Sequence, residues 1–155
     1  MGARGPSERR AAVIQAPKVA LVAHQPLAGA WLDCAEHVLG RRPPVECVDV
    51  PADVDPEAMY GQLLERLSGG AGGTLVLCDV FGATPFNIAR RVVQQLNLQG
   101  EQAVLLTGVN LCMVLKALTT SDVDLKTLAV QVQEAGRKGV VDACEGLASV
   151  GSVSS

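Results

Sequence analysis

Residues 74–85 read Thr-Leu-Val-Leu-Cys-Asp-Val-Phe-Gly-Ala-Thr-Pro. The first half, up to Asp79, is a short and continuous apolar run, which is typical of a strand buried inside a parallel sheet. The second half is a turn that ends with Thr84 and Pro85, and this pair is typical of the start of a helix. A strand that passes through a short turn into a helix is the repeating unit of α/β folds.

The same order of strand and helix recurs along the chain. Apolar runs of strand length lie at residues 18–23, 45–50, 74–79 and 103–107, and each is followed by apolar residues at helical spacing. Because crossovers between parallel strands are right-handed, this order predicts an α/β fold: a doubly wound, mainly parallel open sheet with helices on both faces. We expect the strand order 2-1-3-4 and a short C-terminal strand at residues 139–142.

Several helix starts carry recognisable caps. Asp55 precedes a proline at the first helical position, and Asn110 precedes the apolar face of the next helix but one. Ser121 and Asp124 have the spacing of a capping box, with Ser121 as the cap of the last helix. These residues predict where three of the helices begin.

Length and composition predict a single domain. The chain has 155 residues, of which 48% are hydrophobic, and this is enough to bury a core. Residues 1–17 are rich in glycine, proline, arginine and alanine, so we expect a mobile N-terminal tail. Residues 18–142 would form the folded domain, and residues 143–155 a frayed C-terminal tail.

Charge and composition argue against several classes of function. The formal net charge is -3, aromatic residues make up 3% of the chain, and no basic stripe is present, so we expect no nucleic-acid binding. No segment is long and apolar enough to span a bilayer, and the apolar run after Arg10 is too short for a signal peptide. We therefore expect a cytoplasmic protein that is not inserted in a membrane.

The five cysteines are Cys34, Cys47, Cys78, Cys112 and Cys144. No two of them have the CxxC spacing of a zinc site, and each lies in an apolar or helical context. We interpret them as small, reduced core residues, and we expect neither a metal site nor a disulfide framework.

His24 and Asp79 are the candidate chemical pair. His24 follows the first strand and Asp79 ends the third. In the order 2-1-3-4 these strands are neighbours, so both side chains would lie at the switch point where α/β sheets bind ligands. If the carboxylate accepts a hydrogen bond from Nδ1–H, it fixes the tautomer of the ring and leaves Nε2 free as a nucleophile. It would also stabilise positive charge on the ring during attack on phosphorus.

The turn after Asp79 suits a phosphate group. Gly82, Ala83 and Thr84 lie where the turn enters a helix, whose first amides and positive dipole end attract anions. Gly82 would let the backbone approach closely. Thr84 could donate from its hydroxyl or its amide, or it could simply cap the helix. No residue pattern calls for a cofactor.

Four motifs give the chain a family resemblance. They are Val22-Ala-His24 with Leu27-Ala-Gly-Ala-Trp31, Asp79-Val-Phe-Gly-Ala-Thr-Pro-Phe-Asn87, Thr107-Gly-Val-Asn-Leu-Cys-Met113, and Glu134-Ala-Gly-Arg-Lys-Gly-Val140. From about Val19 to Asp142 the chain resembles the mannose-type enzyme IIA domain of the bacterial phosphoenolpyruvate-dependent sugar phosphotransferase system.

The resemblance implies that His24 is the phosphorylated histidine and that Asp79 hydrogen-bonds it. The phosphoryl group would come from the phosphohistidine of a small carrier, HPr, and would pass to an enzyme IIB partner in sugar uptake. We expect this partner to be a separate chain. Related domains form homodimers by exchanging the final strand, which here would lie around Val140 and Val141.

The chain departs from the family pattern beside the histidine and in the phosphate turn. Gln25 and Ala83 stand where the family has glycine, and Pro26 is also unusual. A side chain at Ala83 restricts the backbone if a positive φ is required there. We expect these changes to affect the choice of donor and the rate of transfer rather than the reaction.

Two alternatives with the same fold stay open, and two further classes of function are weaker. A regulatory phosphocarrier, or the phosphotransfer subunit of a dihydroxyacetone kinase, would use the same chemistry with a different partner. A flavodoxin-like or receiver-like binding module would need a phosphate loop, or an acid pair for magnesium, after the first strand. This chain has Gln25 and Pro26 there. A Ser-His-Asp hydrolase would need a GxSxG elbow, which the sequence lacks.

Overall fold

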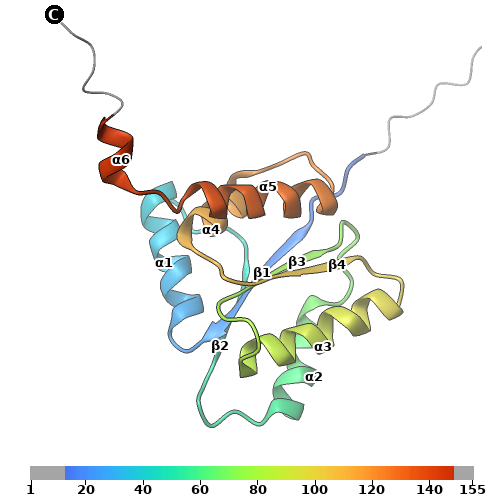
Figure 1. Cartoon of the computed structure of the whole chain (residues 1–155). Helices are drawn as coiled ribbons and strands as arrows, with labels where there is room; N and C mark the ends of the chain where they lie inside the picture. The colour runs from blue at the N-terminus through green and yellow to red at the C-terminus, as the bar shows by residue number, and fades with distance from the viewer. Residues whose placement is uncertain (1–12, 149–155) are drawn as a thin grey trace, which may run out of the picture.

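The computed structural model of the chain describes residues 13–148. Within this range, strands and helices alternate as far as β4, and helices α4, α5 and α6 follow (Figure 1). In chain order the elements are β1 (Lys18–His24), α1 (Leu27–Leu39), β2 (Glu46–Val50), α2 (Pro56–Leu67), β3 (Thr74–Cys78), α3 (Thr84–Leu98), β4 (Ala103–Leu106), α4 (Leu111–Thr119), α5 (Leu125–Lys138) and α6 (Ala143–Ala148). The four predicted β-strands before the C-terminal segment are confirmed.

The strands form one parallel sheet in the order β2-β1-β3-β4, which confirms the predicted fold class and strand order. On one side of β1, His24 pairs with Val50 of β2. On the other side, Val22 pairs with Cys78 of β3. The carboxyl ends of these three strands therefore meet at one edge of the sheet, and Asp79 leaves β3 at that edge.

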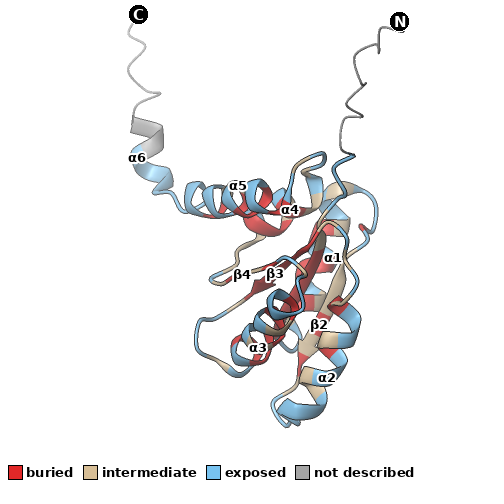
Figure 2. Cartoon of the chain, turned by 90° about the vertical axis from the view of Figure 1, so that its right-hand side faces the viewer, coloured by how far each residue is buried: buried red, intermediate tan, exposed pale blue. Residues whose placement is uncertain are grey.

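Helices cover both faces of the sheet, as predicted. α1, α4 and α5 pack on one face, and α2 and α3 on the other (Figure 1). Every residue of β3 is buried, and the sheet is the buried centre of the molecule (Figure 2). Strands that are apolar along their whole length are what a sheet covered on both faces requires.

Two of the three predicted caps are confirmed. The side chains of Asp55 and Asn110 accept hydrogen bonds from amides in the first turns of α2 and α4. The capping box with Ser121 as the cap is wrong, because α5 begins later. Asp124 is itself the cap and accepts from the amide of Thr127.

The predicted C-terminal strand at residues 139–142 is not formed. This segment has no regular secondary structure and joins α5 to α6. Val140 and Val141 are 78% and 73% exposed, because the segment leaves the end of α5 and pairs with no strand of the described sheet. α6 lies in the stretch for which the sequence predicts a tail, and it projects away from the sheet (Figures 1 and 2). Parts of both predicted tails, residues 1–12 and 149–155, lie outside the described residues.

The interpretation of the cysteines as core residues is right for Cys78 and wrong for most of the others. Cys78 is buried and Cys47 half-buried, whereas Cys34, Cys112 and Cys144 are exposed. All five are free thiols. Cys34 lies on α1 but outside the buried face of this helix. That buried face consists of Ala28, Trp31, Leu32 and Ala35.

A glycine on α5 lets this helix pack closely against α4. A Cβ atom at Gly136 would lie 2.6 Å from Cγ and from Sδ of Met113, which is buried. Asn110, the cap of α4, donates from Nδ2 to the carbonyl oxygen of Gly136 at 3.0 Å. The sequence motifs at residues 107–113 and 134–140 therefore meet at this helix contact.

We predict that Gly136→Ala destabilises the protein by about 1–2 kcal/mol, because the added methyl group overpacks the contact with Met113. Gly61→Ala in α2 is the matched control. A Cβ atom at Gly61 would meet nothing within 4 Å. Alanine there should stabilise the helix by about 0.5–1 kcal/mol. Urea unfolding measures both changes, and equal changes in the two variants would contradict the packing argument.

Candidate active site

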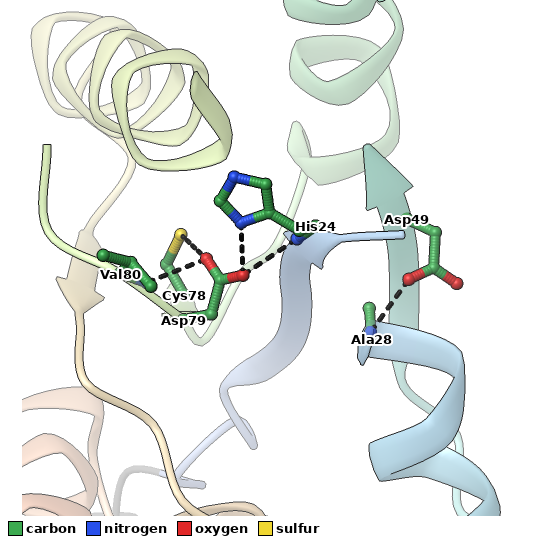
Figure 3. A network of polar contacts seen from close by, with 6 residues as sticks. All are labelled: His24, Ala28, Asp49, Cys78, Asp79 and Val80. Carbon is green, nitrogen blue, oxygen red and sulfur yellow. Dashed lines mark hydrogen bonds and ion pairs between the residues drawn. The ribbon is translucent and has the colours of Figure 1, made fainter. Parts of the chain in front are cut away.

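β1 and β3 bring a histidine and a carboxylate into contact. His24 is the last residue of β1, and Asp79 follows the last residue of β3. Nδ1 of His24 lies 2.7 Å from Oδ2 of Asp79 (Figure 3). The predicted convergence of the two side chains at the strand ends is confirmed.

Asp79 is held in place by backbone amides as well as by the ring. Its Oδ2 accepts the backbone N–H of His24 at 2.9 Å, and its Oδ1 accepts the backbone N–H of Val80 at 2.8 Å. The side chain of Asp79 is only 6% exposed, whereas that of His24 is 51% exposed. A fixed and shielded carboxylate thus supports a ring that faces solvent.

The surroundings of Asp79 favour its ionised form. Burial raises the pKa of this carboxyl group, but hydrogen bonds from His24 and Val80, together with the charge interaction with the ring, outweigh burial and leave the pKa lowered. An ionised carboxylate only accepts hydrogen bonds, so Nδ1 of His24 is the nitrogen that carries the proton. In the neutral ring Nε2 then has the free lone pair, and it points away from Asp79 (Figure 3).

Cys78 contacts the same carboxylate. Its Sγ donates to Oδ1 of Asp79 across 3.7 Å. Burial, and after it the charge of Asp79, raises the pKa of the Cys78 thiol to about 12. The thiol therefore stays protonated and remains a weak donor.

The turn after Asp79 needs a glycine at one position. Gly82 has a φ of 83°, in the left-handed region that favours glycine, whereas Ala83 has a φ of -79°. The side chain of Ala83 is therefore compatible with the turn, and the departure from the family pattern at this position causes no backbone strain. Asn87 holds the turn by donating from Nδ2 to the carbonyl oxygen of Gly82 at 3.2 Å.

α3 begins without a side-chain cap. Ala83 occupies the capping position, and Thr84 is the first residue of the helix, so the interpretation of Thr84 as the cap is wrong. Pro85 has no N–H, and the amides of Thr84 and Phe86 have no acceptor within the helix because they belong to its first turn. Gly82, Ala83 and Thr84 are thus on one turn that leaves the same strand end as Asp79.

Sequence reasoning missed Asp49. This residue lies on β2, and its carboxylate accepts hydrogen bonds from the amides of Ala28 and Gly29 at the start of α1. The sequence feature that could have revealed this contact is an acidic residue between two valines, at the end of a strand that is otherwise apolar there. Such a residue needs a donor when it is covered by a helix.

Residues 13–148 contain neither a cluster of metal ligands nor a membrane-spanning helix. No group of three or more His, Cys, Asp or Glu side chains there is arranged to hold a metal ion. No helix in that range combines the length and the apolar character needed to cross a membrane.

Comparison with known proteins identifies the family. Residues 18–133, which run from β1 into α5, match the family described as the PTS system fructose IIA component. The chain belongs to this family. Its IIA proteins are components of a phosphotransferase system, so the resemblance that the four motifs indicate is confirmed.

Curated relatives of this IIA chain include mannose-specific proteins. The PTS system mannose-specific EIIAB component of Escherichia coli (strain K12) is 32% identical to it over 114 residues. The alignment takes in 70% of this chain and 34% of the relative. The chain therefore spans about a third of the length of the curated relatives it matches.

Solved IIA structures share the fold. The phosphotransferase system component EIIA from Streptococcus agalactiae superimposes with a TM-score of 0.73 at 24% identity, over 81% of this chain and 95% of that chain. The mannose/sorbose-specific IIA subunit from Enterococcus faecalis gives the same TM-score and identity, over 81% of this chain and 93% of that chain. The doubly wound sheet is thus the IIA fold.

We predict that Asp79 makes the stability of this IIA chain fall at acid pH. Its pKa in the folded protein is lower than its ordinary value of about 4. Its contribution to stability is therefore present above that value and is lost as the pH falls through the folded pKa. The advantage of the wild type over Asp79→Asn, measured as unfolding free energy from neutral pH to about pH 3, should shrink below about pH 4. A difference that stays constant with pH would contradict this assignment.

Proposed function

We propose that the chain is a cytoplasmic phosphocarrier. It accepts a phosphoryl group on His24 from a phosphorylated HPr-type carrier and passes it to an enzyme IIB-type acceptor in sugar uptake. The observation that carries the proposal is the 2.7 Å contact between Nδ1 of His24 and Oδ2 of Asp79, with Nε2 turned outward. Membership of the IIA family supports the same assignment.

The transfer is a direct exchange between two imidazoles. The lone pair of Nε2 on His24 attacks phosphorus, an N–P bond forms there, and the N–P bond of the donor breaks with its electron pair left on the donor nitrogen. Nδ1 keeps its proton, so the phosphorylated ring carries positive charge that Asp79 offsets. Attack by the acceptor protein reverses these steps. The scheme requires neither a metal ion nor a cofactor.

The start of α3 is the proposed site for the phosphoryl oxygens. Gly82, Ala83 and Thr84 would supply backbone amides at its positive dipole end, where the amide of Ala83 makes only a long contact of 3.5 Å to the carbonyl oxygen of Val80. The first turns of α1, α2, α4 and α5 each receive an oxygen from a side chain. α3 receives none from its capping residue. An anion can therefore approach α3 without displacing a capping side chain.

Mass spectrometry with site mapping, after incubation with enzyme I, HPr and phosphoenolpyruvate, tests the proposal. The wild type should gain a phosphoryl group on His24, and His24→Ala should gain none because the nucleophile is gone. His37→Ala is the matched control, since His37 is exposed on α1 and takes no part in the contact with Asp79. It should be labelled like the wild type.

The stability of the label in acid and in base distinguishes phosphohistidine from an acyl phosphate. Phosphohistidine is lost in acid and retained in alkali, whereas an acyl phosphate on a carboxylate is lost in base. A label on His24→Ala, or an acid-stable label on the wild type, would refute the assignment.

We also propose that the protein forms a homodimer in which residues 139–142 of one copy lie against β4 of the other. β4 is an edge strand of the described sheet, so its outer backbone groups are open to pairing. A groove of about 470 Å³ beside β4 is lined by apolar side chains such as Val104 and Val130 and by polar ones that include Lys126. Val140 and Val141 are exposed in the single chain and suit such a groove.

We predict that the double variant Val140→Lys with Val141→Lys is monomeric where the wild type is dimeric, because two charges cannot enter an apolar groove. Val38→Lys is the control, since Val38 is an exposed apolar residue on α1, 57% accessible. Sedimentation velocity measures all three proteins. A monomeric wild type, or a double variant that remains dimeric, would contradict the proposal.

A further inference from the structure

The first turn of α1 is held by a side chain from a different element. Oδ1 of Asp49 accepts the backbone N–H of Ala28 at 2.8 Å, and Oδ2 accepts the backbone N–H of Gly29 at 3.1 Å. Figure 3 shows the first of these bonds beside the His24 site. The residue in the capping position, Pro26, makes no side-chain cap bond. Asp49, which lies on β2, therefore acts as the cap of this helix.

The anchored turn is close to His24 along the chain. Gln25 donates its backbone N–H to the carbonyl oxygen of Val50 at 3.0 Å, and Val50 is the partner of His24 in the sheet register. The connection from His24 to α1 is thus fixed at its start by β2 backbone and at its end by Asp49. Both fixed points come from the same strand.

We propose that Asp49 is a positioning residue for phosphoryl transfer. By anchoring the first turn of α1 it fixes the backbone that carries His24, and so keeps the imidazole aligned with Asp79. Asp79 holds the amide of His24 from β3, at 2.9 Å. The histidine thereby lies between two carboxylates, one on β2 and one directly after β3. The kinetic part of this inference rests on the proposed function.

Gly29 makes the close approach of this carboxylate to the helix achievable. A Cβ atom at Gly29 would lie 3.0 Å from Oδ2 of Asp49, which is tighter than an ordinary van der Waals contact. A side chain there would push the carboxylate away without changing the charge of the chain. The contact gives a physical role to the glycine of the sequence motif at residues 27–31.

Asp49 also affects which helix end attracts the phosphoryl group. Its negative charge offsets the positive dipole end of α1, a helix that begins three residues after His24. α3 keeps an uncapped first turn. Phosphate on His24 is consequently favoured beside α3 rather than beside α1.

The test compares Asp49→Ala with Asp124→Ala. Asp124 caps α5 by accepting a hydrogen bond from the amide of Thr127 at 2.7 Å. It lies next to the loops that precede β3 and β4, where the strands begin, whereas His24 lies where β1 ends. Its loss therefore removes a comparable cap far from the histidine. Nitrogen NMR of the His24 ring gives the fraction with the proton on Nδ1, without any phosphate present. Labelling by phosphorylated HPr gives the transfer rate.

We expect Asp49→Ala to lower the Nδ1–H fraction and to slow transfer at saturating carrier by about tenfold, because a misplaced nucleophile loses alignment. The carrier concentration for half-maximal rate should change little. Asp49→Asn keeps an oxygen for the amide of Ala28 and should recover part of both losses. Asp124→Ala should match the wild type. If Asp49→Ala does not fold, Gly29→Ala should show the same two losses.

Different outcomes would contradict the positioning role of Asp49 and the proposed function. A wild-type tautomer in the variants at Asp49 and Gly29, with or without slower transfer, would overturn the positioning role, and so would equal losses in Asp124→Ala. A wild type that takes no phosphate would overturn the proposed function. In that case the tautomer measurement alone would decide on Asp49.

Discussion

The carboxylate of Asp79 links the end of β3, the loop that follows and the imidazole of His24 through its hydrogen bonds. It lies where β3 ends and is almost removed from solvent, so it needs hydrogen-bond donors. His24, at the end of β1, donates from its backbone and its ring, and Val80 donates from its backbone. Those bonds keep it ionised and thereby determine which nitrogen of His24 carries the proton. The parallel arrangement of β1 and β3 is what brings the partners together, since their carboxyl ends fall at one edge.

Sequence patterns predicted the fold and the contact between His24 and Asp79 because both follow from where the apolar strands begin and end. Continuous apolar runs mark strands covered on both faces, and the right-handed crossover rule then orders them. Once β1 and β3 are neighbours, His24 and Asp79 must converge. The caps at Asp55 and Asn110 were also predictable, since each acts on the helix directly after it.

The errors have different physical causes. Asp49 caps a helix that precedes its own strand, so no local spacing reveals the contact. Thr84 looks like a cap from composition, but the left-handed turn at Gly82 moves the helix start, and Ala83 takes that position. Residues 139–142 have the composition of a strand, yet strands require a partner edge, which composition does not specify.

Cys78 bears on how selective this centre is among nucleophiles. Its thiol contacts the same carboxylate as the ring of His24, and a thiol becomes a strong nucleophile when it loses its proton. Burial raises the pKa of this thiol to about 12, however, so the thiol stays protonated at neutral pH. The sulfur is also fully buried. Enclosure in the sheet thus keeps the thiol protonated and away from solvent, and in the function proposed above it leaves the imidazole of His24 as the acceptor.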